Sequence, residues 1–373
     1  MREMKTKAFL KWAGGKEREL PYILPCLPAY EHYYEPFVGG GAVFASVTAA
    51  HYFINDKSEE LAGFYRAIAG QDSAFYRWIE AICESWERLL DFASPQGLDS
   101  KAPEPFDCRV LEALPTDVIL SAFPWHRHIF RQEIAKGLKR KSSRLVALER
   151  DYGPLKPEDV QDAFQTVLLG SLYMYFRHLY NCAEVQQIPG LPTALFLFIR
   201  SYAYSGMFRY NAQGAFNVPY GGRGYNRKSL RGKLDYYRST ALTEKFSRTT
   251  VFNLDFEDFL CRCQPSANDF LFLDPPYDSD FSTYAKNAFT RRDHERLASW
   301  LLTATQAKWM LVIKRTPFIE RLYLGHGLSI ARFDKTYQVS FMNRNDRQAE
   351  HLMIANYPLL LEAFTQVAAQ RAV

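Results

Sequence analysis

Residues 270–277 read Phe-Leu-Phe-Leu-Asp-Pro-Pro-Tyr, an apolar run that passes directly into an acid, two prolines and an aromatic ring. A short apolar run bounded by such a break is typical of a buried strand. Asp274 then stands at the carboxyl end of that strand, the position at which ligands bind in open α/β sheets. We therefore expect a ligand site at Asp274. The alternative is a strand that merely ends in a proline-rich turn with a capping acid.

The chemistry of amine methylation accounts for the residue types in this motif. An aromatic amine is a poor nucleophile because its lone pair is delocalised into the ring. The Asp274 carboxylate and a backbone carbonyl can accept the two N–H bonds and aim the lone pair at a methyl sulfonium. Pro275 fixes the backbone nearby, and Tyr277 can stack on a flat base. Positioning of two bound reactants would then be the main catalytic device.

The first seventy residues predict alternating strands and helices. A short aromatic strand at 33–38 ends in glycines, a small-residue helix follows at 41–50, and a second strand at 52–54 leads to Asp56. A helix is expected at 59–69, because its apolar residues fall on one face. This order is the opening of a doubly wound α/β sheet.

The pattern changes after residue 72. Helical patterns are expected at 73–92 and about 117–182, and a segment rich in Gly, Asn and Tyr at 203–228 predicts hairpin and loop. Strand-like runs return at 250–254, 269–273, 309–313 and 351–354, with a helix at 292–304.

These patterns predict one α/β sheet built from both ends of the chain. Residues 1–72 would form its cofactor-binding half and residues 249–373 its catalytic half. A mostly helical insertion with a hairpin or loop, residues 73–248, would lie between them.

The composition of the 373-residue chain, 47% apolar and 23% charged, is that of an ordinary globular protein. It has no apolar run long enough to span a bilayer and no signal-peptide core, so we expect a cytoplasmic protein without a membrane partner. Of the six cysteines only Cys261 and Cys263 are close, and a lone C-x-C lacks the second pair of a zinc site. We therefore expect reduced cysteines and no metal.

Positive charge is concentrated in two segments, although the net charge is only +5. Residues 200–248 hold ten Lys or Arg against two acids, interleaved with aromatic residues, and residues 126–150 hold eight against two. Such segments bind phosphate backbones and unstacked bases. The alternative for either segment is a solvated surface.

Two features of the amino-terminal half suit a nucleotide-like cofactor. Glycines 39–41 permit a tight turn and a close approach of a ligand to the backbone. They do not form a dinucleotide fingerprint, because Phe44 stands where the third glycine belongs. Asp56 can hydrogen-bond a ribose diol or cap the helix that follows, and the sequence favours neither.

Together these segments resemble the Dam-like, D12-class adenine-N6 DNA methyltransferases. The matching segments, in the family's order, are 9–16 (FLKWAGGK), 34–41 (YEPFVGGG), 54–56 (IND), 209–219 (RYN, Gly214 and FNVP) and 274–277 (DPPY). Family-like spacing continues at Phe281, Tyr284, Phe289, Asp293 and His294. The resemblance implies a Rossmann-like methyltransferase sheet, S-adenosyl-L-methionine as cofactor and double-stranded DNA as substrate.

The resemblance also implies roles for individual positions. The cofactor would be bound by Trp12, Lys16, Phe37, Gly39, Asp56, Asp255, Phe256 and Asp274. Lys16 would lie near the cofactor's carboxylate, Asp56 on its ribose hydroxyls, and Asp255-Phe256 near its adenine. Catalysis would fall to Asp274, Pro275 and Tyr277, around an adenine flipped out of the duplex.

The same resemblance implies DNA contacts. Base-contacting positions of Dam-like enzymes that read GATC are matched by Lys11, Arg209 and Pro219. Tyr204 matches an aromatic ring that wedges into the duplex. Arg209 can pair bidentately with guanine, but a phosphate contact and a salt bridge within the hairpin remain alternatives.

The chain departs from the Dam pattern in three places. Ser205 and Met207 replace Asn and Leu, and the helical stretch 85–180 is longer than in typical members. These departures leave GATC or a related site open as the target. The sequence indicates neither an oligomeric state nor whether a cognate restriction endonuclease exists.

Three other functions are alternatives to adenine methylation of DNA. Another amino methyltransferase, acting on cytosine N4, RNA adenine or protein glutamine, could use a similar motif. An inactive DNA-binding relative would be expected to have lost Asp274, Asp56 or Lys16, and all three are present. A P-loop hydrolase is excluded, because Leu10 and Glu17 replace residues that its motif requires.

Overall fold

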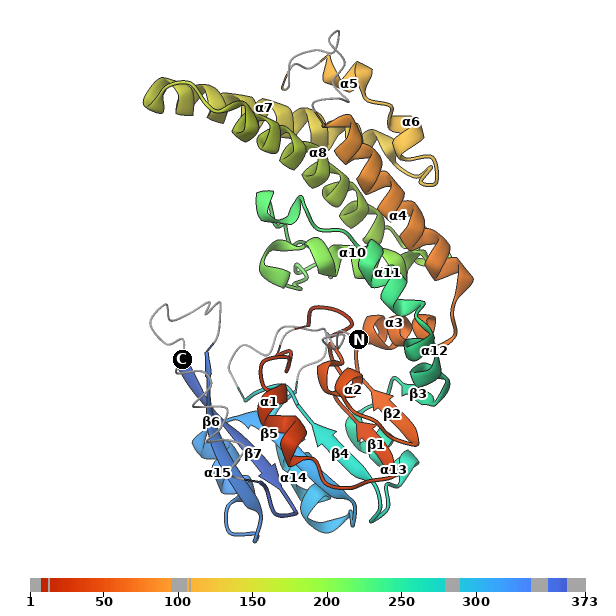
Figure 1. Cartoon of the computed structure of the whole chain (residues 1–373), viewed down its shortest axis with the longest axis vertical. Helices are drawn as coiled ribbons and strands as arrows, with labels where there is room; N and C mark the ends of the chain where they lie inside the picture. Colours follow the sequence, from red (N-terminus) through yellow and green to blue (C-terminus); the bar gives the residue numbers. More distant parts are fainter. Residues whose placement is uncertain are drawn as a thin grey trace. The chain divides into compact units, whose positions relative to one another are not determined.

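The computed structural model describes residues 8–12, 14–94, 106, 109–278, 289–336 and 348–360, with backbone alone at 334–336 and 348–349. The chain forms two compact units. The sheet unit comprises Met1–Ala69 and Thr243–Val373, and the helical unit comprises Gly70–Leu242. Each unit has its own buried core. Figure 1 labels the helices and strands of both units.

The sheet unit contains a seven-stranded sheet in the order β3-β2-β1-β4-β5-β7-β6. Its strands are β1 (His32–Glu35), β2 (His51–Asn55), β3 (Thr249–Phe252), β4 (Phe270–Leu273), β5 (Lys308–Lys314), β6 (Ser329–Thr336) and β7 (Gln348–Ala355). The first five in this spatial order are parallel, and β7 runs antiparallel to both β5 and β6. The sheet is therefore a mixed α/β, Rossmann-like sheet.

The order of the strands reverses between β1 and β4. From β1 the chain continues to β2 on one side, and from β4 it continues to β5 on the other. The two strands pair through Tyr33 with Phe270 and Tyr34 with Leu271. Ligands of doubly wound sheets bind outside the carboxyl ends of the strands at such a switch point. The fold therefore places a ligand crevice beyond Glu35 and Leu273.

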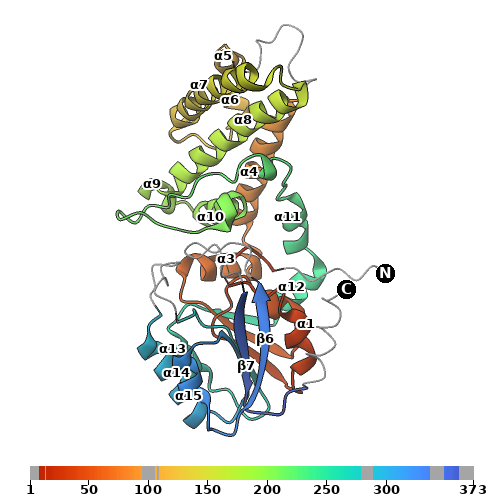
Figure 2. The ribbon, with the colours of Figure 1, turned by 90° about the vertical axis from the view of Figure 1, so that its left-hand side faces the viewer.

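Alternation of side chains along β4 and β5 explains how both faces of the sheet are covered. Leu271, Leu273 and Leu311 point to one face and pack in a core with α13 (Phe256–Cys263), α14 (Arg291–Thr303) and α15 (Pro317–Tyr323). Figure 2 shows these three helices together on that face. Strands buried on both faces read as continuous apolar runs, as β4 does.

The opposite face of the sheet is covered by a second set of helical elements. They are α1 (Leu20–Ile23), η1 (Leu24–Cys26), α2 (Ala42–Ser46), α3 (Glu59–Ala69) and α12 (Thr240–Ser247). Phe9 lies at the centre of an aromatic cluster on this side, with its ring centroid 5.7 Å from Phe44, 5.8 Å from Tyr65 and 5.6 Å from Phe246. Phe9 is thus packed into the sheet unit.

The helical unit combines long helices with several short ones. They are α4 (Ser73–Phe92), α5 (Val110–Ala113), α6 (Thr116–Ile119), α7 (Arg127–Tyr152), α8 (Pro157–Tyr180), α9 (Ala183–Gln186), α10 (Leu191–Tyr202) and α11 (Arg231–Tyr237). Short turns η2 (Tyr204–Gly206) and η3 (Arg223–Tyr225) follow α10. Figure 1 shows α7 and α8 side by side.

Local sequence explains where the long helices begin and end. Asp72 caps α4 by accepting hydrogen bonds from the backbone N–H groups of Ala74 and Phe75. Gly153, with φ of 85°, ends α7, and Pro157 opens α8 at a position where its missing N–H costs nothing. The expected helical stretch at 117–182 is therefore mainly two helices joined by a turn.

Several element boundaries differ from the expectations. The first strand ends at Glu35, and the helix after it covers only Ala42–Ser46. The segment 203–228 contains two isolated antiparallel bridges, Ala203 with Tyr220 and Tyr210 with Phe216. Among the described residues no helix combines the length and apolarity that crossing a bilayer would need.

Candidate active site

Four loops converge at the carboxyl edge of the parallel strands. One loop begins with Pro36 after β1, one with Asp56 after β2, one with Asn253 after β3, and one with Asp274 after β4. Because β3, β2, β1 and β4 are neighbours and parallel, these loops share one edge of the sheet. The edge includes the switch point, so the candidate site is built from these loops.

Lys16 connects the amino-terminal segment to the loop after β4. Its side chain is only 3% exposed, and its ammonium forms an ion pair with the Asp274 carboxylate. The ammonium also donates to the Tyr277 hydroxyl and to the Gly14 carbonyl, both at 3.1 Å. A buried ammonium is tolerated only when it is paired and hydrogen-bonded. This cluster therefore brings together Lys16, Asp274 and Tyr277, and Pro275 is buried between the last two.

The glycine turn after β1 is filled by protein. A Cβ on Gly39, where φ is +49°, would lie 3.0 Å from Cδ1 of Trp12, and a Cβ on Gly40 would lie 2.7 Å from the Leu10 carbonyl oxygen. The Phe9 N–H donates to the Gly40 carbonyl at 3.0 Å. The absence of side chains at these glycines thus lets residues 9–12 pack across the turn, and it brings Trp12 to the site.

Asp56 is tied to the same turn. Its Oδ2 accepts a hydrogen bond from the Gly39 N–H at 3.1 Å, and its Oδ1 accepts one from the Ser58 N–H at 2.9 Å. Desolvation raises the pKa of Asp56 to about 6, against the lowering effect of these two bonds. Ser58, not Asp56, caps α3, since its Oγ accepts from the Leu61 N–H at 3.3 Å. Each carboxylate oxygen of Asp56 accepts one N–H and keeps capacity for another donor.

Phe37 and Phe256 meet in an aromatic cluster at this edge. Their ring centroids are 5.6 Å apart, and Phe289 lies 5.6 Å from the first and 5.7 Å from the second. Asp255 precedes this cluster and caps α13 through the Glu257 N–H. Its carboxylate also binds Arg296 at 2.7 Å and Lys57 at 3.2 Å.

The charged partners of Asp255 determine its protonation. Burial would raise the pKa of Asp255, but hydrogen bonds from Arg296, the Glu257 backbone and Lys57 lower it below the usual range. Both oxygens therefore already serve the protein's own groups. The expected contact with a cofactor adenine would have to be made beside these bonds.

Sequence reasoning gave no role to Asn55, although its side chain binds two of the loops. Its buried side-chain amide donates to the Pro36 carbonyl at 3.0 Å and to the Leu254 carbonyl at 3.1 Å. Its Oδ1 accepts from the Leu254 N–H at 2.9 Å. One side chain thus links the loops after β1 and β3 to the end of β2. A polar residue at the tip of a buried strand was the available signal.

His294 is a second residue whose role the sequence did not reveal. It lies on α14, is 1% exposed, and its imidazole hydrogen-bonds the backbone carbonyl of Pro276. Its Nε2 has no hydrogen-bond partner among the described residues. Desolvation lowers the pKa of His294 to about 4, so the ring is neutral. The expected spacing at Phe281 and Tyr284 lies outside the described residues.

A buried carboxyl, Glu35, completes the edge. It is 2% exposed and accepts a hydrogen bond from the Tyr33 hydroxyl at 2.8 Å. Burial raises the pKa of Glu35 well above its usual range, and the nearby Asp274 carboxylate adds to this effect. The acid that ends β1 thus lies close enough to the acid that follows β4 for their charges to interact.

Three of the four expected DNA contacts lie on one loop of the helical unit. Tyr204 and Pro219 are joined by a hydrogen bond of 2.9 Å from the Tyr204 N–H to the Pro219 carbonyl, and both are exposed. Arg209 is exposed, with its Nε 3.4 Å from Oδ1 of Asn217. Lys11 is also exposed but belongs to the sheet unit.

This loop is anchored on α8 and α10. The side chain of Asn181 donates to the Phe216 carbonyl at 3.0 Å and accepts from the Phe216 N–H at 2.9 Å. The buried guanidinium of Arg200 lies 4.6 Å from the centre of the Phe208 ring. The exposed side chains of the loop are therefore carried on a fixed backbone.

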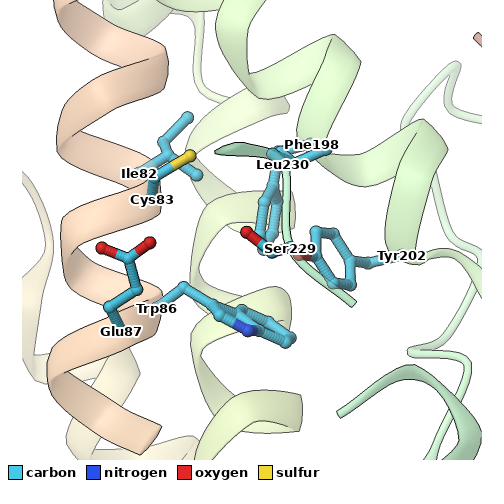
Figure 3. A pocket seen from close by; sticks show the side chains of 8 residues that line it. All are labelled: Ile82, Cys83, Trp86, Glu87, Phe198, Tyr202, Ser229 and Leu230. Atoms are coloured by element: carbon cyan, nitrogen blue, oxygen red, sulfur yellow. The ribbon is translucent and has the colours of Figure 1, made fainter. Parts of the chain in front are cut away.

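A small pocket in the helical unit is not the cofactor site. It has room for about one water molecule, and it is lined by Ile82, Cys83, Trp86, Glu87, Phe198, Tyr202, Ser229 and Leu230 (Figure 3). Its only carboxylate, that of Glu87, is held by the guanidinium of Arg231 through bonds of 2.9 and 2.8 Å. Cofactor pockets are many times larger.

Comparison with known proteins identifies the family of this chain. The family model of D12 class N6 adenine-specific DNA methyltransferases matches residues 12–93 and 156–339. The Type II methyltransferase M.CviBI of Paramecium bursaria Chlorella virus NC1A is 26% identical over 94% of this chain and 100% of that protein. The DNA adenine methylase of Vibrio cholerae is 23% identical over 91% of this chain and 93% of its own length.

A third relative is also named as a Type II methyltransferase. The Type II methyltransferase M.MjaIII of Methanocaldococcus jannaschii is 26% identical over 95% of this chain and 100% of that protein. The family match covers the glycine turn, Lys16, Asp56 and the motif at 274–277, and the segment between its two parts lies in the helical unit. The chain therefore belongs to the D12 class of N6 adenine-specific DNA methyltransferases.

Proposed function

We propose that the chain transfers the methyl group of S-adenosylmethionine to N6 of an adenine in duplex DNA, at the carboxyl edge of the sheet. The contact of Lys16 with Asp274 and Tyr277 carries this proposal. It links the amino-terminal cofactor segment to the catalytic motif at the switch point of the sheet. That is the juxtaposition which methyl transfer between two bound reactants requires.

The residues at this edge suit S-adenosylmethionine. Asp56 has acceptor capacity left for ribose hydroxyls, and the rings of Phe37 and Phe256 offer an apolar surface for an adenine. Lys16 supplies a cation for the carboxylate, and Trp12 packs against the turn at Gly39. When bound, S-adenosylmethionine supplies a sulfonium-activated methyl group.

The motif after β4 would hold the target amine. The Asp274 carboxylate and a backbone carbonyl of the motif accept the two N–H bonds, and Pro275 fixes the backbone between them. Tyr277 stacks on the adenine ring. His294 holds the Pro276 carbonyl from the buried side of the loop, so the motif is set before substrate binds.

The helical segment, residues 73–248, would read the DNA. Arg209 and Pro219 would contact bases, and Tyr204 would wedge into the duplex. In support, all three are exposed on one anchored loop. Lys11 adds a contact from the sheet unit. The target adenine is flipped out at a cost of a few kcal/mol, at GATC or a related site.

The test is expression in cells that lack adenine methylation, followed by base-resolution mapping of modified DNA. We expect N6-methyladenine at one short sequence motif, and none with the Asp274→Ala variant at equal expression. Purified enzyme with labelled S-adenosylmethionine should label DNA and neither RNA nor protein. Label that enters only RNA, protein or cytosine N4 would reject the proposal.

A further inference from the structure

A cluster of two histidines and a cysteine lies in the helical unit. His178 lies in the last turn of α8, Cys182 follows two residues after that helix ends, and His126 immediately precedes α7. Nδ1 of His126 is 2.7 Å from Nε2 of His178, and Sγ of Cys182 is 3.5 Å from the same nitrogen. One ligand atom from each residue lies within 4.8 Å of the others.

Glu184 sets the orientation of His126. Its Oε1 lies 2.9 Å from Nε2 of His126, on the side of the ring opposite His178. A carboxylate there holds the proton on Nε2 and leaves the Nδ1 lone pair directed at the cluster. Metal-bound histidines typically donate their second N–H to such a carboxylate, which fixes the tautomer.

We propose that this cluster binds a divalent transition-metal ion, zinc by its donor chemistry. The ligands are His126 Nδ1, His178 Nε2 and the Cys182 thiolate, and a water completes the tetrahedron. Two imidazoles and a thiolate select zinc over magnesium or calcium, which prefer oxygen ligands. Zinc holds nitrogen at about 2.0 Å and sulfur at about 2.3 Å, so small shifts of these side chains suffice.

The ion would fasten the enlarged segment of the helical unit to the rest of it. His126 lies outside the two matched family segments, whereas His178, Cys182 and Glu184 lie inside the second one. α7 buries only Phe130, Ile134 and Leu138 along its 26 residues. Metal coordination by His126, just before the first turn, would add a strong constraint to these three apolar contacts.

The sequence did not point to this site because its ligands are far apart along the chain. His126 and His178 are separated by 52 positions, and the spacing of His178 and Cys182 alone is common in helices. Only the antiparallel packing of α7 on α8 brings the two segments together. The metal-free alternative is a hydrogen-bond network in which Nε2–H of His178 donates to Nδ1 of His126.

The full chain, purified without chelator, tests the proposal. We expect bound zinc in stoichiometric amount by elemental analysis, and a lower melting temperature after the zinc is removed by chelation and restored when zinc is added back. Cobalt substitution should give the thiolate-to-metal charge-transfer band of a tetrahedral site. A chain that holds no zinc, shows no such band and melts at the same temperature with chelator has only the hydrogen-bond network.

Matched variants locate the ion. Cys182→Ser should abolish the charge-transfer band and the response to chelator, whereas Cys261→Ser, at an exposed cysteine of the sheet unit, should leave both unchanged. A band that survives Cys182→Ser would overturn the assignment. If Cys182→Ser fails to fold, His126→Ala, which keeps the thiol, is expected to weaken zinc affinity at least about tenfold. Unchanged affinity in that variant would also overturn it.

Discussion

The ammonium of Lys16 and the hydroxyl of Tyr277 lie 3.1 Å apart, although 261 positions separate the two residues in the chain. The same ammonium pairs with Asp274. A single lysine thus spans the proposed cofactor segment and the proposed target-binding motif. A buried ammonium without an anionic partner would be strongly destabilising.

Lys16→Ala should therefore weaken cofactor binding more than DNA binding. Loss of a hydrogen bond to a charged group costs about 1.5–3 kcal/mol, which corresponds to an increase of roughly tenfold or more in the KM for S-adenosylmethionine. Steady-state kinetics with each substrate varied separately measures the effect. Lys308→Ala, at a lysine that donates to the Ala29 carbonyl in the same unit, is the control. Equal KM values in the two variants would remove Lys16 from the cofactor site.

Asn55→Ala should reduce both stability and cofactor affinity. It leaves the Pro36 carbonyl and both backbone groups of Leu254 without their partner, at about 1–3 kcal/mol for each buried group that stays unsatisfied. Denaturant unfolding and calorimetric titration with S-adenosylmethionine measure the two effects.

A matched asparagine separates stability from function. Asn356 makes comparable bonds at the other end of the sheet, accepting from the Trp309 N–H at 2.8 Å and donating to the Ala307 carbonyl at 2.9 Å. Asn356→Ala should destabilise the chain and leave cofactor affinity unchanged. If both variants lose stability alone, Asn55 has no part in shaping the site.

Cofactor affinity should fall as the pH is lowered through about 6, the value to which desolvation raises the pKa of Asp56. The ionised carboxylate accepts ribose hydroxyls with both oxygens, and the protonated form loses that capacity. Affinity is therefore full above this pKa and declines below it. Titrations at several pH values should show the decline in the native chain and a flat, weaker profile in Asp56→Asn. A native profile with no change in this range would contradict the ribose role.

The sequence predicted those parts of the fold that depend on local pattern. The run 270–273 is apolar and ends at Asp274, which identified a buried strand and its functional tip. The helix α10 escaped notice because it is apolar on nearly every side, and such a segment has no period to distinguish helix from strand. The strand β6 was also not predicted. It lies at the edge of the sheet beside β7 and mixes polar with apolar residues, so it has no continuous apolar run.

Contacts between distant segments were beyond sequence reasoning. The glycines at 39–41 were expected to permit a ligand's close approach, and in the structure Gly39 and Gly40 also permit close approach of Trp12 and Leu10. That closeness depends on how residues 9–12 return to the sheet, which no local pattern encodes. The same holds for Asn55, whose three partners belong to loops separated by about two hundred positions.

His294→Ala should lower kcat and leave the KM for S-adenosylmethionine nearly unchanged. The imidazole hydrogen-bonds the Pro276 carbonyl, which belongs to the motif at 274–277. Misplacement of a reacting group by about 1 Å can cost up to about 100-fold in rate. His294→Asn can keep a donor close to the position of the imidazole N–H and should recover part of the rate.

Two further observations define the role of His294. Its pKa of about 4 means that the ring stays neutral across the working range, so the pH profile of kcat should not change in the Asn variant. His326→Ala, at an exposed histidine of the same unit, should behave as the native chain. Loss of rate in His294→Ala without any recovery in His294→Asn would point to packing alone.

Arg209→Ala should relax the choice of target sequence. Arg209 is exposed on the loop that Asn181 fixes to α8, so its guanidinium can reach DNA without a change in the backbone that carries it. A bidentate contact to guanine is worth about 1–3 kcal/mol of discrimination against another base. Methylation of oligonucleotide pools with each position of the mapped motif varied measures this preference. Arg227→Ala, at an exposed arginine of the same unit, is the control. An unchanged preference, with equally weakened binding to all sequences and a shallower salt dependence, would make Arg209 a phosphate contact instead.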